Sequence, residues 1–203
     1  MQNKIVCRPM EMPDIKKVVK IHIEAFNGFF LTFLGPQFLE QLYMGIQTDS
    51  SGISYIVTID GEIAGFVAGT DQPAGFYKRL IRHRLIPFFL ASILPALQRP
   101  VIIPRLLRAF RKTEERKDNL GFAKLMSIAI SPLFQGKGIG KILLDAFITE
   151  CIQRDISGID LETDSINNIS TNKFYLSKGF QWVGQYQTPE GREMNQYQML
   201  LIK

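Results

Sequence analysis

The feature that most constrains the fold of this chain is a strand, a glycine-rich loop and a helix in direct succession. Residues 125–130 are mostly apolar, Ser131-Pro132 ends that run, and glycines stand at every second position across 136–140. Apolar residues with helical spacing follow, at Ile139, Ile142, Leu143, Ala146, Phe147 and Cys151. This order predicts a loop that presents the unpaired N–H groups of a helix N-terminus to an anion.

Two common nucleotide-binding motifs are excluded at this loop. A Walker phosphate loop needs G-x-x-x-x-G-K-[ST], but Gly140-Lys141 is followed by Ile142, and Gln135 stands where the first glycine belongs. A dinucleotide fingerprint needs G-x-G-x-x-G, and Lys141 occupies the place of the third glycine. The loop therefore holds an anion of another kind, or it is a tight turn with incidental glycines.

The rest of the chain alternates between strand and helix patterns. Asp60-Gly61 between two apolar runs is a strong hairpin signal. We expect strands at 4–9, 53–59, 62–70, 125–130, 159–163, 180–187 and 193–202, and helices at 13–26, 31–46, 138–153 and 168–178. This order predicts a mixed α/β fold on one central sheet, within a single domain at 1–203.

Composition limits the class of protein further. The chain has 203 residues, 46% hydrophobic and 21% charged, which is the balance of a soluble domain with one core. Its two cysteines are too few for a disulfide framework, so we expect a cytoplasmic protein. Two histidines argue against a His/Cys metal site, and we expect no metal. The longest mainly apolar run, 85–97, has two prolines and is too short to span a bilayer.

The positive charge of the chain is concentrated in one segment. Residues 71–120 contain 11 Lys or Arg and 4 Asp or Glu, while the whole chain carries a net charge of +5. Basic and apolar residues alternate there, and prolines divide the segment into short helices. The alternatives are a helical cap with its charge in solvent, a membrane-surface contact through 78–112, a site for an anionic substrate, and a partner interface. Nucleic acid is not expected, because stacking aromatics are not interleaved with the charges.

Three parts of the run from 125 to 180 resemble the GNAT acetyl-CoA-dependent N-acetyltransferases. They are the strand that ends in Ile128-Ala129-Ile130, the loop Gln135-Gly136-Lys137-Gly138-Ile139-Gly140, and the block from Asn168 through Tyr175 to Gly179-Phe180. The loop matches the family pattern [QR]-x-x-G-x-[GA], and the block resembles N-x-x-A-x-x-x-Y-x-x-x-G-F with Thr171 in place of alanine. The resemblance implies a mostly antiparallel sheet flanked by helices, and it leaves the stretch 71–120 as a helical insertion.

The resemblance also implies where acetyl-CoA, as co-substrate, would bind. The main chain around the loop would hold the pyrophosphate, the strand before it would pair with the pantetheine arm and polarise the thioester, and Tyr175 would protonate the leaving thiolate. The residues implied in cofactor binding are Ile128, Ala129, Ile130, Gln135, Gly136, Lys137, Gly138, Ile139, Gly140, Lys141, Asn168, Asn172 and Tyr175.

The general base is less clearly marked. Some relatives carry a glutamate at the start of the strand before the loop, where this chain has Lys124. Others carry one five residues before the asparagine, where this chain has Thr163, with Glu162 adjacent. A one-residue bulge would bring Glu162 into that role. Asp164, a purely structural carboxylate and deprotonation through water remain as alternatives.

The leading hypothesis is an N-acetyltransferase that acts on a primary amine of a small molecule, for example an amino sugar, by direct attack. In the family the acceptor lies between the first helices and the last hairpin, here 27–31 and 188–193. The rivals are a protein N-terminal acetyltransferase and a catalytically weak acyl-CoA-binding module. That module would act through its basic insert on a partner, or on the inner face of a membrane as a peripheral protein. A homodimer is left open.

Overall fold

The protein is built on one seven-stranded sheet in the order β1–β2–β3–β4–β5–β7–β6. The computed structural model describes residues 4–26, 29–83, 87–88, 91, 121–189 and 191–201. All neighbouring strands pair antiparallel except β4 with β5, which are parallel. The strands are β1 (Ile5–Pro9), β2 (Gly52–Ile59), β3 (Glu62–Thr70), β4 (Phe122–Ile130), β5 (Gly158–Asp164), β6 (Gln181–Gln187) and β7 (Glu193–Leu200). The predicted mixed and mostly antiparallel sheet with flanking helices is confirmed.

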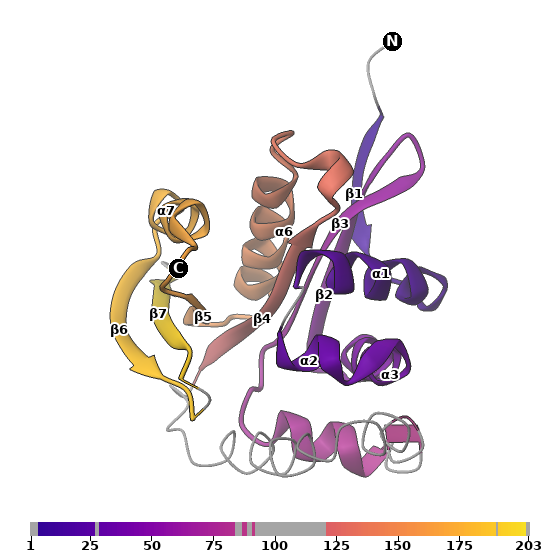
Figure 1. Cartoon of the computed structure of the whole chain (residues 1–203), viewed down its shortest axis with the longest axis horizontal. Helices are drawn as coiled ribbons and strands as arrows, with labels where there is room; N and C mark the ends of the chain where they lie inside the picture. Colours follow the sequence, from indigo (N-terminus) through magenta and orange to yellow (C-terminus); the bar gives the residue numbers. More distant parts are fainter. Residues whose placement is uncertain are drawn as a thin grey trace.

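Helices cover both faces of the sheet and bury a separate apolar cluster on each (Figure 1). On one face lie α1 (Ile15–Ala25), α2 (Phe30–Phe33) and α3 (Gly35–Thr48), and on the other lies α6 (Ile139–Gln153), with α7 (Ile169–Ser177) beside the strands that follow β4. Successive side chains of a strand point to opposite faces of the sheet, so β3 contributes to both clusters. Phe66 packs under α1 and α3, while its neighbour Val67 packs under α6.

The predicted hairpin and most predicted elements are found within a few residues of the expected bounds. Asp60 and Gly61 have φ of 51° and 85°, the left-handed pair that a two-residue hairpin turn requires. The single helix expected at 31–46 is wrong, because the chain turns between α2 and α3. Gly35 has φ of +81°, and Pro36 stands in the first turn of α3.

Only the first part of the basic segment 71–120 is described. Residues 76–83 are helical, and Leu80 is buried where a side chain at Gly45 of α3 would collide with it. The ring of Phe88 packs on that of Phe38 with 5.0 Å between centroids. This part therefore caps α3, and the remainder of the stretch predicted to touch a membrane, 78–112, lies outside the described residues. In the part of the chain that is described, no helix has the length and apolar character needed to cross a bilayer.

Candidate active site

The site begins at a gap in the sheet between β4 and β5. These strands pair from Phe122 with Gly158 to Leu125 with Leu161, and their register ends there. The following residues, 126–130 of β4 and 162–164 of β5, line a cavity of about 1240 Å³. Sites for one small ligand measure roughly 300–1,000 Å³, so this cavity has room for more than one molecule.

The backbone of β4 turns unpaired polar groups toward this gap. The Ser131 N–H donates to the Ala64 carbonyl oxygen at 2.8 Å, in the direction of β3. Directions alternate along an extended strand, so Ala129 also bonds toward β3 while the N–H groups of Ile128 and Ile130 face the gap. An added extended chain in the gap would find hydrogen-bond partners there.

The glycine loop lies at the same cavity. Gln135, Gly136 and Gly140 line it, and Gly136 and Gly138 both have φ of +75°. The helix α6 begins at Ile139, directly after Gly138, and no side chain caps its N-terminus. Uncapped N–H groups in the first turn of a 15-residue helix favour a negative group.

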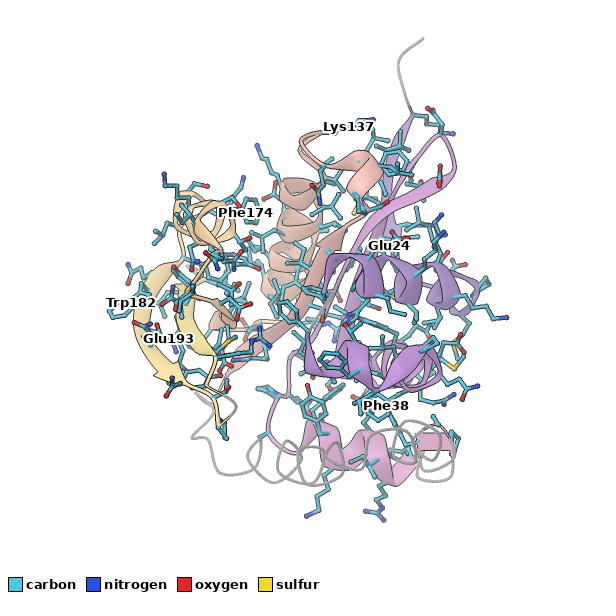
Figure 2. All side chains as sticks on the ribbon, viewed as in Figure 1. Glu24, Phe38, Lys137, Phe174, Trp182 and Glu193 are labelled. Carbon is cyan, nitrogen blue, oxygen red and sulfur yellow. The ribbon has the colours of Figure 1, made fainter. Side chains whose placement is uncertain are left out.

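Five of the predicted cofactor residues do not line the cavity themselves, namely Lys137, Gly138, Ile139, Lys141 and Asn172. Lys137 and Lys141 are exposed, and the Lys137 ammonium lies 5.2 Å from the centre of the Phe134 ring. Figure 2 shows Lys137 at the loop above α6. The side chain of Ile139 is buried in the core, and Gly138 has none, so these two could touch a cofactor only through their main chain.

Tyr175 lines the cavity with a hydroxyl that makes no hydrogen bond to any described residue. Its ring packs among those of Phe174, Phe180 and Tyr197, with centroids 5.5, 5.7 and 6.0 Å away. The side chain is 4% exposed, and burial raises its pKa above the usual value. The phenol is therefore protonated at neutral pH and available as a donor.

The two predicted asparagines differ in how much of their hydrogen-bonding capacity is already used. Asn168 lines the cavity and donates to Thr163 Oγ1 at 2.7 Å. Asn172 donates to the Asp164 carbonyl at 2.9 Å and accepts from the Tyr197 hydroxyl at 2.8 Å. Asn172 thus ties α7 to the sheet, and a cofactor contact by either asparagine stays a prediction.

Glu162 reaches the cavity without the predicted bulge, because β5 keeps one register with β7 from Gly158 to Asp164. Its Oε1 is 3.1 Å from the Lys124 ammonium, and its Oε2 accepts a hydrogen bond of 2.6 Å from the Tyr186 hydroxyl. Lys124 also pairs with Asp160, its neighbour across β4 and β5. The sequence carried a signal for this pairing, since Asp160 and Glu162 share one face of a strand.

The two segments predicted to flank an acceptor meet at the cavity. The Arg192 guanidinium lies over the Phe29 ring, 4.2 Å from its centre, and its Nη2 is 2.6 Å from Asp164 Oδ1. All three residues line the cavity, and so do Leu31 and Thr188. Residues 27–28 and 190 of these segments lie outside the described part.

His22 is a lining residue that the sequence analysis did not foresee. Its Nδ1 is 2.6 Å from the Tyr43 hydroxyl, while its buried Nε2 has no partner among the described residues. The side chain is 2% exposed, and burial lowers its pKa to about 4. A helical stripe of apolar residues in α1 concealed this histidine, because it occupies a core position of that stripe.

The cavity connects the two faces of the sheet through the gap. Gly140 and Tyr175 belong to the α6 side, and Phe26 and His22 belong to the α1 side. Figure 2 shows Phe174, which packs near Gly140, on the side of α7 toward α6. Residues from both faces of the sheet thus line one cavity between β4 and β5.

A sequence model described as the acetyltransferase (GNAT) family matches residues 105–180, the stretch that holds β4, the glycine loop, α6, β5 and α7. Over this stretch the chain is similar to the GNAT acetyltransferases. The match indicates an acyltransferase enzyme. Within the described residues, no cluster of His, Cys, Asp or Glu could hold a metal ion.

Proteins similar to this chain include a plant acetyltransferase and bacterial structures. Histone acetyltransferase TAP1 from Glycine max is 34% identical over 77 residues, which are 38% of this chain and 30% of that protein. The chain thus spans about a third of the length of this curated relative. Ribosomal-protein-alanine N-acetyltransferase from Brucella melitensis has a TM-score of 0.65 at 14% identity, covering 97% of this chain and 99% of its own. The acetyltransferase yncA from Salmonella typhimurium, solved with acetyl-CoA, has a TM-score of 0.61 at 14% identity, covering 98% and 95%. At these identities the structures establish the shared fold.

Proposed function

We propose that this protein transfers an acetyl group from acetyl-CoA to a primary amine of a small molecule by direct attack. The observation that carries the proposal is the open gap between β4 and β5. It joins an uncapped helix N-terminus on one face to a second chamber on the other face. A long cofactor with a pyrophosphate at one end and a thioester at the other suits such a passage.

Acetyl-CoA would lie with its pyrophosphate at the first turn of α6 and its pantetheine arm in the gap. The N–H groups of Gly136 to Gly140 provide the anion site, since glycine allows close approach and the helix dipole favours negative charge. The N–H groups of Ile128 and Ile130 would bond the arm as a neighbouring strand does. The thioester carbonyl then lies near these same N–H groups, which can stabilise an oxyanion.

The chemistry then needs few groups. The amine nitrogen attacks the acetyl carbon, an N–C bond forms, the C–S bond breaks, and the thiolate leaves as the thiol of CoA. Tyr175 supplies the proton to sulfur, and Glu162 accepts the proton of the amine, directly or through water. In this site both the Tyr175 phenol and the CoA thiol are shielded from water, and this desolvation raises the pKa of both groups. Most of the rate enhancement comes from holding the amine and the thioester in the correct relative position.

Two other assignments remain as outcomes of the test. One is a protein acceptor, which the names of relatives such as the plant histone acetyltransferase suggest. The other is an acyl-CoA-binding module that works at a membrane or partner through 78–112. We also propose, as the sequence predicts, a cytoplasmic location, peripheral membrane contact and a homodimer.

The test combines binding and turnover. Calorimetry measures the affinity for CoA, and release of free thiol from acetyl-CoA is followed with and without amines. Amine-dependent thiol release supports the transferase. Tight CoA binding with no release across small amines and peptides would support the module, and absence of CoA binding would overturn both. Co-sedimentation with neutral and anionic vesicles decides the membrane contact, which is rejected if sedimentation does not depend on anionic lipid.

A further inference from the structure

Aromatic rings wall the acceptor end of the cavity. The lining there includes Phe26, Phe29, Phe33, Phe76 and Tyr77, from the end of α1, the start and end of α2, and the helix at 76–83. The rings of Phe26 and Phe29 meet edge to face at 5.2 Å, and those of Phe76 and Tyr77 at 5.7 Å. The basic segment thus contributes aromatic rings, rather than charge, to the described part of this chamber.

The charged side chains in the described lining already neutralise each other. They are two cations and two carboxylates, arranged as the pairs Lys124–Glu162 at 3.1 Å and Arg192–Asp164 at 2.6 Å. A polyamine would need further carboxylates for its remaining ammonium groups, and a phosphate-bearing acceptor would need further cations. Neither set is present among the described residues that line the chamber.

We propose that the acceptor is an amine carried on an uncharged apolar body, with an aromatic ring as its best-fitting form. This inference rests on the proposed function, because it places the amine at the thioester and the body among the rings. The body would lie against Phe29 and Phe33, with the nitrogen directed to Glu162 in the gap. Aromatic side chains bind such a body by burial and by edge-to-face contacts.

The same aromatic lining disfavours an amino sugar as the acceptor. The hydroxyl groups of an amino sugar would lose water against phenylalanine rings, which return no hydrogen bonds, and this desolvation is unfavourable. Among the described residues, the charged groups of this chamber already bond with each other and with Tyr186. The amino-sugar example suggested by the sequence is therefore the less favoured acceptor.

The experiment compares amines that differ in the body and share the reactive group. Thiol release is measured with phenethylamine, methylamine, glucosamine, spermidine and a short peptide with an N-terminal alanine. We expect kcat/KM for phenethylamine to exceed that for glucosamine by roughly 10- to 100-fold, the value of burying one aromatic side chain. Calorimetric titration of phenethylamine into CoA-saturated protein gives a readout that does not require turnover.

Two variants make the test specific. Phe33 lines the cavity and is 40% exposed, so Phe33→Ala should keep the fold and lower kcat/KM and affinity for phenethylamine about 10-fold. Methylamine has no body to lie against this ring, so its kcat/KM should fall less. Trp182→Ala is the control, because this aromatic of β6 is 54% exposed and does not line the cavity. It should change neither quantity.

The outcomes separate this inference from the proposed function. Best turnover of glucosamine, spermidine or the peptide would overturn the assignment, and so would a phenethylamine preference that survives both Phe33→Ala and Phe26→Ala. If no amine releases thiol but phenethylamine binds and Phe33→Ala weakens it, the transferase fails and the ligand class stands. If phenethylamine neither reacts nor binds while another small amine releases thiol, this inference falls and the transferase stands. If no amine reacts or binds, both fall.

Discussion

At the scale of single residues, the hydroxyl of Tyr175 allows catalysis to be separated from stability. It has no hydrogen-bond partner among the described residues, so Tyr175→Phe removes no bond that the fold uses. We expect kcat to fall roughly 100-fold, because the thiolate loses its proton donor. CoA affinity by calorimetry and the urea midpoint should stay at their wild-type values.

Tyr197→Phe is the matched control for that prediction. Its hydroxyl donates to Asn172 Oδ1 at 2.8 Å, so this variant should lose about 1 kcal/mol of unfolding free energy and retain most activity. Equal kcat in Tyr175→Phe and wild type would remove Tyr175 from the mechanism.

His22 predicts how stability depends on pH. Burial lowers its pKa from the usual 6.5 to about 4. Between pH 6.5 and pH 4, His22 therefore binds a proton in the unfolded chain but not in the folded one. Stability is therefore complete above pH 6.5 and falls as the pH drops toward 4. At pH 5 the loss relative to pH 7 is roughly 2 kcal/mol. Urea unfolding at both pH values measures it.

The His22→Gln variant should lose most of this pH dependence, because no imidazole remains to be charged on unfolding. His83→Gln, at an exposed position of the helix at 76–83, should retain it. An identical fall in stability for His22→Gln and wild type would mean that other groups cause it.

At the scale of elements, the glycine loop offers a comparison between two left-handed positions. Gly136 has φ of +75° and Gly61 has φ of +85°, and a Cβ at either would meet nothing within 4 Å. Alanine strains both by about 1–2 kcal/mol. Only Gly136→Ala distorts the anion site, so its affinity for CoA should fall about 10-fold while Gly61→Ala binds normally.

Calorimetry and urea unfolding together check this pair. Similar losses of stability with unequal losses of CoA affinity are the expected result. If Gly136→Ala binds CoA as tightly as wild type, then the loop does not hold the pyrophosphate.

Local patterns predicted the elements well, and they failed where two elements interact. Asp60-Gly61 and the stripe of α6 are local signals, and both give the correct element. The break at Gly35 was missed because apolar residues continue at helical spacing across it. The early start of β4 at Phe122 depends on pairing with β5, which no local pattern contains.

The candidate site shows the same division. The loop and the Tyr175 block were found from motifs within one stretch of chain, and both lie at the cavity. The contact of Arg192 with Phe29 joins segments more than 160 residues apart, and the role of Lys124 follows from the carboxylates of β5. Tertiary packing decides such contacts, so the sequence indicated the regions without the pairs.

At the scale of the whole molecule, the gap divides the sheet into two halves with different expected responses to the cofactor. Strands β1 to β4 form one half with α1, α3 and α6, and β5 to β7 form the other with α7 (Figure 1). The backbones of the two halves pair at four positions between β4 and β5. A cofactor bound in the gap would add hydrogen bonds where the strands have separated.

This arrangement predicts a pattern of hydrogen exchange on binding acetyl-CoA. Amides at 126–130, 135–141 and 168–175 should exchange more slowly, because the arm pairs with β4 and the pyrophosphate binds the start of α6. At 100-fold excess over Kd the cofactor adds about 2.7 kcal/mol of stability, so globally exchanging amides also slow, while the edge strand β1 changes least. Mass spectrometry of peptides, with and without ligand, measures each segment. Strong protection at β1 without protection at 126–130 would place the cofactor elsewhere, since a molecule outside the gap has no reason to stabilise the separated end of β4.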